Sequence, residues 1–181
     1  DITEYIKRIG TQTIEVKVTD PTDKGPQPRG KQVSKPGGIW YTSVTGIWQT
    51  VWIEAVPETY ISGTRQTPDI DKEMLSIDVT TENLKPGDTI IVKALRGETL
   101  VAKSKSADGS AIIVQVPGPQ LWSPESPFLY DLEISIDRNG TVVDQVKGYF
   151  AMRKISLIPD TNGTLRMMLN NAFVFQFGPL D

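Results

Sequence analysis

The chain has 181 residues, with 19 Lys and Arg against 22 Asp and Glu, a net charge of −3, and no Cys or His. A weakly acidic chain without a cationic cluster argues against nucleic-acid binding, and no apolar run approaches the roughly 20 residues that span a bilayer. Disulfides and Cys-ligated zinc are excluded, and so is a Ser-His-Asp relay. Carboxylate chemistry of the kind used on glycosidic bonds remains open.

The N-terminal segment predicts a helical turn, then a strand, then a long loop. "DITEYIKR" is compatible with one helical turn, and Ile14, Val16 and Val18 then alternate with polar residues, as in a strand with one buried face. The loop from Asp20 to Gly38 carries four prolines and four basic residues. A loop of this length is usually functional or disordered, which makes it the first candidate for a site.

Three of the four tryptophans lie in "GGIWYTSVTGIWQTVWIE", residues 37–54. From residue 47 the predicted strand is apolar on both faces, with Ile47, Val51 and Ile53 on one and Trp48 and Trp52 on the other. We expect the aliphatic face to lie in a sandwich interior. The two tryptophans are about 13 Å apart at strand rise, too far to hold one sugar ring, so we expect them to cover a neighbouring layer or domain.

Residues after about Tyr60 predict a set of strands at the intervals of an immunoglobulin-like sandwich. Strict alternation of apolar and polar residues marks strands at 75–79 and 130–136, and "KPGD", "ADGS" and "DRNG" supply turns. "PGPQLWSPESPF" predicts an ordered crossing between strands, with Trp122 as a packing anchor. The fold class is therefore all-β, built from antiparallel sandwiches.

Taken together, these segments resemble glycoside hydrolase family 2, the group of β-galactosidases, β-glucuronidases and β-mannosidases. The resemblance covers essentially the whole chain and rests above all on "GIWQTVWIE" and "LWSPESPFLY", with "DIT", "VKVTDPTD", "GYFAMRKISL" and "LNNAFVFQFGPLD" in the family's order. The commoner family form has Asn-Gly at the position of Asn170-Asn171, and "FAMR" replaces a frequent Phe-Gly-hydrophobic-Arg.

The resemblance implies a particular domain organisation. Residues 1–59 are expected to be the C-terminal part of a jelly-roll sugar-binding domain, residues 60–157 an Ig-like sandwich, and residues 158–181 the linker and first strand of a truncated (β/α)₈ barrel. The two catalytic glutamates of the family lie in the barrel, so we expect no catalytic residue and no turnover in this chain. No cofactor or metal is expected; the expected partners are a β-linked glycoside and the barrel itself. Relatives of this type are frequently periplasmic or at the cell surface.

The candidate substrate-binding residues are Arg29, Lys31, Gln32, Trp40 and Tyr41. In relatives, a jelly-roll loop helps to shape the pocket for the terminal sugar, and the segment from Arg29 to Gln32 has side chains that donate hydrogen bonds to hydroxyls or a carboxylate. Trp40 and Tyr41 follow the loop and offer flat apolar faces for a pyranose ring. The bland alternative is a solvated loop followed by two packing aromatics.

Two acidic pairs invite a catalytic interpretation, Asp69 with Asp71 and Asp131 with Glu133. Residues two apart on a strand share a face, but here it is the polar face of an alternating pattern, which favours solvated carboxylates. The segment "DIDKE" lacks the Gly-containing spacing of a calcium loop.

Two other functions stay open at this stage. The chain could be a stand-alone carbohydrate-binding module with an Ig-like spacer, which predicts polysaccharide binding by the isolated chain. It could also be a structural Ig-like surface module, which predicts none.

Overall fold

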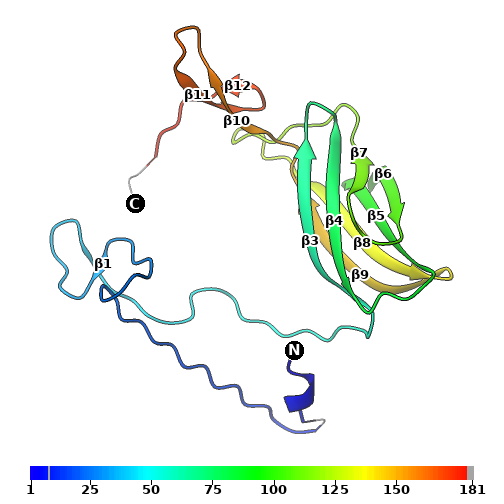
Figure 1. Cartoon of the computed structure of the whole chain (residues 1–181), viewed down its shortest axis with the longest axis horizontal. Coiled ribbons are helices and arrows are strands. Elements are labelled where there is room, and N and C mark those ends of the chain that lie inside the picture. Colours follow the sequence, from blue (N-terminus) through cyan, green and yellow to red (C-terminus); the bar gives the residue numbers. More distant parts are fainter. Residues whose placement is uncertain (8, 179–181) are drawn as a thin grey trace. The chain divides into compact units, whose positions relative to one another are not determined.

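The structure is a computed structural model that describes residues 1–7 and 9–178. The chain forms two compact units, one made of residues 1–53 with Gly178 and one of residues 54–177, and each is described by itself. Across the described part of the chain the ordered elements are strands, apart from one short 3₁₀ helix, η1 (Thr3–Tyr5) (Figure 1). The protein is therefore all-β, as the sequence predicts.

The first unit contains little regular structure beyond η1. Its two short strands, β1 (Gln32–Val33) and β2 (Tyr41–Thr42), pair in parallel. The strands predicted at 14–18 and at 47–53 do not form, because these extended segments have no neighbouring strand among the described residues to accept their backbone hydrogen bonds. An alternating pattern identifies a face, but it does not supply a partner.

The apolar side chains of residues 47–53 are correspondingly exposed. Trp48 and Trp52 are 87% and 74% exposed, so neither packs within the first unit. The prediction that Ile47, Val51 and Ile53 lie in a sandwich interior is wrong, since all three are also more than half exposed.

The second unit contains a sandwich of two antiparallel sheets (Figure 1). The three-stranded sheet has the order β3-β4-β7 and the four-stranded sheet the order β6-β5-β8-β9. Its strands are β3 (Tyr60–Asp69), β4 (Met74–Glu82), β5 (Asp88–Arg96), β6 (Thr99–Ser106), β7 (Ile112–Gln115), β8 (Tyr130–Arg138) and β9 (Thr141–Phe150). The chain changes sheet after β4, β6 and β7, which gives the crossed connectivity of an Ig-like fold.

The core lies between these sheets and is built from the inward-facing half of each alternating strand. Along β5 the side chains of Ile90, Val92 and Ala94 are fully buried, and along β8 those of Ile134 and Ile136 are at most 1% exposed. Burial of one face by period-2 alternation is what the sequence pattern predicted for β4 and β8. The apolar area removed from water here is the main stabilising contribution to this unit.

The predicted turns lie at the predicted places. Asn139 and Gly140 make the two-residue connection between β8 and β9, with φ values of 54° and 84°. In "ADGS", Gly109 has φ of +81° and its carbonyl accepts a hydrogen bond from Val79 N at 2.8 Å. A Cβ at position 109 would lie 2.4 Å from Val79 O, so only glycine fits this close approach.

The proline-rich crossing between β7 and β8 is ordered and attached to the core, as expected. The Tyr130 ring stacks on Phe150 at 5.1 Å between centroids and meets Phe128 edge-on at 4.9 Å. Its hydroxyl oxygen accepts hydrogen bonds from Gln120 N at 2.8 Å and from the Arg96 guanidinium at 3.2 Å. Trp122 is partly buried and its ring lies 4.8 Å from the Arg153 guanidinium. These contacts hold the crossing against the sandwich.

A third sheet follows the sandwich within the same unit. It has the order β10-β11-β12 and is antiparallel throughout. Its strands are β10 (Ile155–Pro159), β11 (Leu165–Leu169) and β12 (Ala172–Phe173). Both of its faces carry exposed apolar side chains, for example Leu157 and Met167 on one and Ile158 and Phe173 on the other.

Candidate functional site

The long loop of the first unit is held by carboxylates. Asp23 accepts hydrogen bonds from the Ser34 hydroxyl at 2.5 Å and from the Ser34 backbone N–H at 3.2 Å, and these bonds lower the pKa of Asp23 below 3.8. Asp20 accepts from Thr22 N at 2.7 Å and from the Thr45 hydroxyl at 2.8 Å. The two ends of the loop are therefore joined by side-chain bonds, and the loop has a defined shape.

A tight turn presents Trp40. Gly37 and Trp40 exchange backbone hydrogen bonds at 3.2 and 3.1 Å, and Gly38 within the turn has φ of +59°, a conformation that glycine adopts without strain. Trp40 is 41% exposed, and the Arg29 guanidinium lies 5.8 Å from its ring centroid, within the range of a cation–π contact. The glycine turn before Trp40 therefore fixes the backbone that carries the Trp40 ring.

A shallow hollow of about 500 Å³ lies against this ring. Its lining combines one aromatic face with charged and hydroxyl groups: Asp23, Lys24, Val33, Ser34, Lys35 and Trp40. A pyranose has apolar C–H faces and a rim of hydroxyls, which match an aromatic plate flanked by donors and acceptors. The hollow is chemically suited to a sugar and contains no pair of carboxylates for catalysis.

The structure gives the five predicted site residues different roles. Trp40 lines the hollow, and the Arg29 guanidinium lies 5.8 Å from its ring without lining the hollow itself. Tyr41 is 61% exposed and does not line it either. The Gln32 side-chain oxygen accepts from Val44 N at 2.8 Å, so it fastens β1 to the chain beyond β2. Lys31 contributes its carbonyl oxygen to Tyr41 N at 2.8 Å. Gln32 and Lys31 therefore shape the loop.

Sequence reasoning noted Lys24 and Lys35 only as loop charges and missed Asp23 and Ser34. The bond between Asp23 and Ser34 spans 11 residues, a spacing that no local pattern reveals. The repeated Asp in "DPTD" was the one available signal, because Asp in turns commonly accepts backbone hydrogen bonds.

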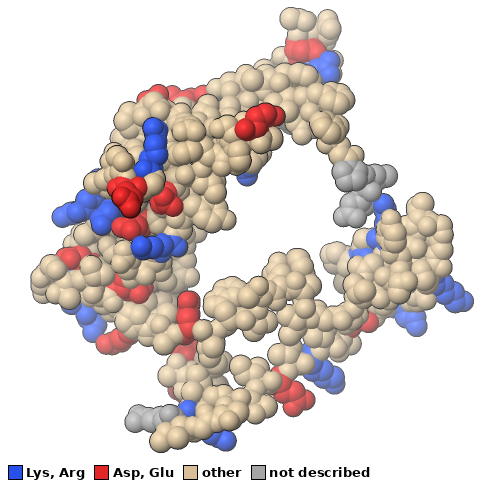
Figure 2. All heavy atoms as spheres, turned by 180° about the vertical axis from the view of Figure 1, so that it is seen from behind, with Lys and Arg blue, Asp and Glu red and all other residues tan. Residues whose placement is uncertain are grey.

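In each acidic pair considered for catalysis, one carboxylate is bonded to neighbouring side chains. Glu133 lies between Lys93 at 3.4 Å and Lys147 at 3.6 Å on the outer face of the four-stranded sheet. Asp71 bonds Lys154 and Asn171. Acidic and basic side chains are interspersed over the sandwich on the face shown in Figure 2. In the described part of the chain no three acidic, His or Cys side chains gather closely enough to hold a metal ion.

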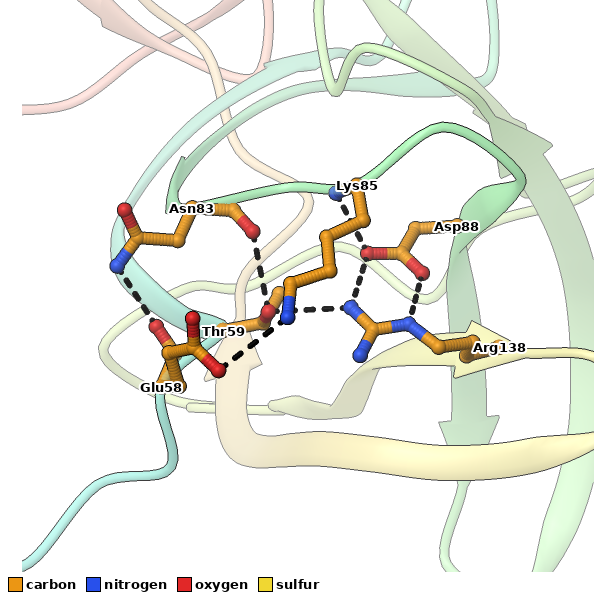
Figure 3. Close-up of polar contacts among 6 residues, drawn as sticks. All are labelled: Glu58, Thr59, Asn83, Lys85, Asp88 and Arg138. Carbon is orange, nitrogen blue, oxygen red and sulfur yellow. Dashed lines mark hydrogen bonds and ion pairs between the residues drawn. The ribbon is translucent and has the colours of Figure 1, made fainter.

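Among the described residues, the most buried charge lies at one end of the sandwich (Figure 3). Asp88 is 4% exposed, and its carboxylate accepts two hydrogen bonds from the Arg138 guanidinium, one from Nε at 2.6 Å and one from Nη2 at 2.7 Å. Lys85 N donates to the same carboxylate at 2.8 Å. The Arg138 guanidinium, with the backbone bond from Lys85, lowers the pKa of Asp88 from 3.8 to about 2.

The same cluster fixes the residues that lead into β3. Thr59 is 1% exposed; its hydroxyl accepts from Arg138 at 3.1 Å and donates to Asn83 O at 3.0 Å. Asn83 Nδ2 donates to Glu58 O at 2.8 Å, and Lys85 Nζ lies 3.2 Å from the Glu58 carboxylate (Figure 3). Each of the six residues shown bonds at least one other member of the cluster, and together they join the segment before β3 to β5 and β8 (Figure 3). We call this cluster the clasp, and its role is structural.

The fold just described is a two-sheet Ig-like sandwich followed by a small antiparallel sheet, and comparisons with known proteins agree with it. The model of glycosyl hydrolases family 2 matches residues 59–153, more than half of the chain. The chain therefore belongs to glycosyl hydrolases family 2. The match covers the sandwich from the Thr59 clasp to the end of β9 and just beyond.

Several relatives are similar over a larger part of the chain. A protein of Formosa agariphila provisionally named beta-glucuronidase is 29% identical over 170 residues, which cover 89% of this chain and 15% of that protein. Beta-galactosidase BoGH2A of Bacteroides ovatus is 24% identical over 174 residues, covering 87% of this chain and 19% of that protein. The chain thus spans about a fifth or less of the length of these relatives.

Among solved structures, the apo β-glucuronidase of Ruminococcus gnavus superposes with a TM-score of 0.57. The match covers 67% of this chain and 20% of that one, at 22% sequence identity. A likeness at this level supports the fold. Among the described residues, no helix has the length and apolar character required to cross a membrane.

Proposed function

We propose that this chain is a non-catalytic part of an enzyme that hydrolyses β-glycosidic bonds, and that it supports the catalytic barrel and shapes the substrate entrance. The observation that carries the proposal is the family match over residues 59–153 together with relatives several times longer, named as β-glucuronidases and β-galactosidases. In the retaining mechanism one glutamate attacks the anomeric carbon and the other protonates the leaving oxygen, and the two carboxyl groups are about 5 Å apart. Both glutamates are assigned to the barrel, outside these residues.

The exposed apolar surfaces support the barrel-contact part of this proposal. Trp48 and Trp52 are exposed, and burying their apolar surface against another part of the protein would lower the free energy. The β10-β11-β12 sheet has the same property on both faces. A strand or sheet that is apolar on two sides needs two covers, and we assign one of them to the barrel.

The Trp40 hollow supports the part of the proposal that concerns substrate. The Trp40 ring provides a stacking surface for a sugar. The Lys24 and Lys35 ammonium groups can donate hydrogen bonds to sugar hydroxyls, and the Asp23 carboxylate can accept them. In the parent enzyme we assign this hollow to a sugar at the substrate entrance. The Arg29 guanidinium over the ring orients the plate and adds a further donor.

An assay of hydrolysis tests the absence of catalysis. The purified 181-residue chain should release no aryl group from aryl β-galactosides, β-glucuronides or β-mannosides above the buffer rate. Appreciable turnover would contradict the proposal. The parent gene should also encode a barrel with two catalytic glutamates downstream of Asp181, and a stop codon shortly after that position is the second contradicting result.

A substitution in the parent enzyme tests the hollow. Trp40→Ala should raise KM about tenfold, the equivalent of about 1.4 kcal/mol of lost stacking, with a smaller change in kcat. Tyr149→Ala is the matched control, because Tyr149 is 66% exposed on β9 and does not line the hollow. Equal kinetics for both variants would remove Trp40 from the substrate site.

A stand-alone carbohydrate-binding module is the second candidate, and the hollow beside Trp40 is the observation that favours it. Calorimetric titration of the isolated chain with a panel of polysaccharides separates the two. Saturable binding that is lost in Trp40→Ala favours the carbohydrate-binding module. Absence of binding by an intact chain favours the non-catalytic part of an enzyme.

A further inference from the structure

The turn between β11 and β12 consists of Asn170 and Asn171, both in the left-handed backbone region with φ of 52° and 66°. Leu169 pairs with Ala172 across it, so this is a two-residue hairpin turn. Such turns favour glycine at the second position, because glycine adopts positive φ without strain. Asn171 occupies that second position, and its side chain has contacts that glycine lacks.

The Asn171 side chain bonds to the sandwich. Its Nδ2 donates to Asp71 Oδ1 at 2.9 Å, and the two residues are 100 positions apart in sequence. Asp71 lies in the turn between β3 and β4, where Asp69 Oδ1 accepts from the backbone N–H groups of Asp71 and Lys72 at 3.1 and 3.0 Å. The carboxylate that Asn171 meets is therefore held by a shaped turn.

The second oxygen of that carboxylate is also bound. Lys154 Nζ donates to Asp71 Oδ2. The bond from Lys154 and then the bond from Asn171 lower the pKa of Asp71 below 3.8, so the carboxylate is charged at neutral pH. One carboxylate thus ties together the β3–β4 turn, the segment before β10 and the β11–β12 turn.

Asn170 adds three bonds beside this carboxylate. Its N–H donates to Lys154 O at 2.8 Å, its Oδ1 accepts from Lys154 N at 3.0 Å, and its Nδ2 donates to Trp122 O at 2.9 Å. Trp122 N in turn donates to Met152 O at 3.0 Å. The turn is consequently joined to the sandwich at several points, while the faces of its sheet stay apolar and exposed.

We infer that Asn171 is a positioning residue that locks the β11–β12 hairpin onto the Ig-like sandwich through Asp71. The bond from the side chain to Asp71 compensates for the strain of a non-glycine residue at positive φ, and the lock fixes the orientation of the third sheet on the sandwich. The consequence for catalysis rests on the proposed function: a locked sheet holds whatever packs on its apolar faces in one orientation relative to the sandwich. The lock itself is a property of this chain and is tested without any substrate.

Hydrogen–deuterium exchange of the full 181-residue chain, read by mass spectrometry, provides the test. Asn171→Gly removes the side chain and keeps the turn. The amides of residues 165–173 should exchange about threefold faster, the effect of losing one modest hydrogen bond, while β5 and β8 keep their rates. Unchanged or slower exchange at 165–173 would overturn the inference, because glycine then merely relieves strain.

Two further variants sharpen the result. Asn139→Gly is the matched control: Asn139 has φ of 54° in the β8–β9 turn, and the side-chain bond at that turn, from Gly140 N to Asp137, does not involve it. It should leave exchange at 165–173 unchanged, and an equal acceleration would overturn the inference.

Asp71→Ala should accelerate the same amides, and adding Asn171→Gly to it should give little more. Full additivity would overturn the inference, since the two residues would then act separately. Failure here leaves the glycosidase proposal untouched, and the reverse also holds.

Discussion

The two units of this protein both contain stretches of alternating apolar and polar residues but use them in different ways. In residues 54–177 alternating strands find partners, and a continuous set of side chains from Ile61 to Met152 is buried between two sheets. In the described residues before position 54 no large hydrophobic side chain is buried, and Ile14, Val16 and Val18 are exposed to solvent. The difference teaches that a strand pattern becomes a strand only when a neighbouring chain satisfies its backbone.

The largest effect should come from emptying the core of the sandwich. Leu75 is fully buried, so Leu75→Ala should lower the free energy of unfolding by roughly 2–5 kcal/mol through lost transfer energy and a residual cavity. Val16 is 58% exposed, and Val16→Ala should change it by less than about 0.5 kcal/mol. Urea unfolding followed by circular dichroism measures both. Similar losses for the two variants would break the contrast between the units.

The clasp at the end of the sandwich should give the next effect. Arg138→Met leaves the Asp88 carboxylate buried without its main partner, which should lower the thermal midpoint clearly but by less than Leu75→Ala. The double variant Asp88→Asn with Arg138→Met should recover part of the loss, because no unpaired charge remains. Differential scanning calorimetry reports both midpoints. A single variant as stable as the wild type would show that the pair is not structural.

Acid should weaken the sandwich through the same carboxylate. The pKa of Asp88 is about 2 in the folded protein and 3.8 as its ordinary value, so its stabilising contribution is complete above about pH 4. The contribution is lost as pH falls from about 4 towards 2, because protonation favours the unfolded chain there. Urea midpoints measured between pH 5 and 2 should fall less steeply in Asp88→Asn than in the wild type. Parallel curves would assign the acid sensitivity to other carboxylates.

The smallest effect should come from the exposed tryptophans of the first unit. Trp52 is 74% exposed, so Trp52→Ala should leave the thermal midpoint of the sandwich unchanged within error. In the parent enzyme the same substitution should lower the midpoint, if this face contacts the barrel as proposed. A drop in the isolated chain would mean that Trp52 already packs within it.

The sequence by itself determined the local features of the protein. Alternation at 75–79 and 130–136 identified β4 and β8, since the side-chain period of a strand is fixed by its own backbone. "DRNG" identified its turn because Asn and Gly accept positive φ wherever they occur. The all-β class and the family resemblance followed from such segments in order, and Trp40 was singled out as a candidate for the site.

Only the tertiary structure decided which segments have partners and which polar residues meet. It left 14–18 and 47–53 unpaired, joined Asp88 to Arg138 across 50 positions, and brought Asp23 and Ser34 together in the loop. It also joined the Gln32 side chain to Val44 N, a bond across 12 positions. These outcomes depend on hydrogen bonds and burial between residues distant in sequence, and a local pattern carries no information on which distant residue will lie opposite it.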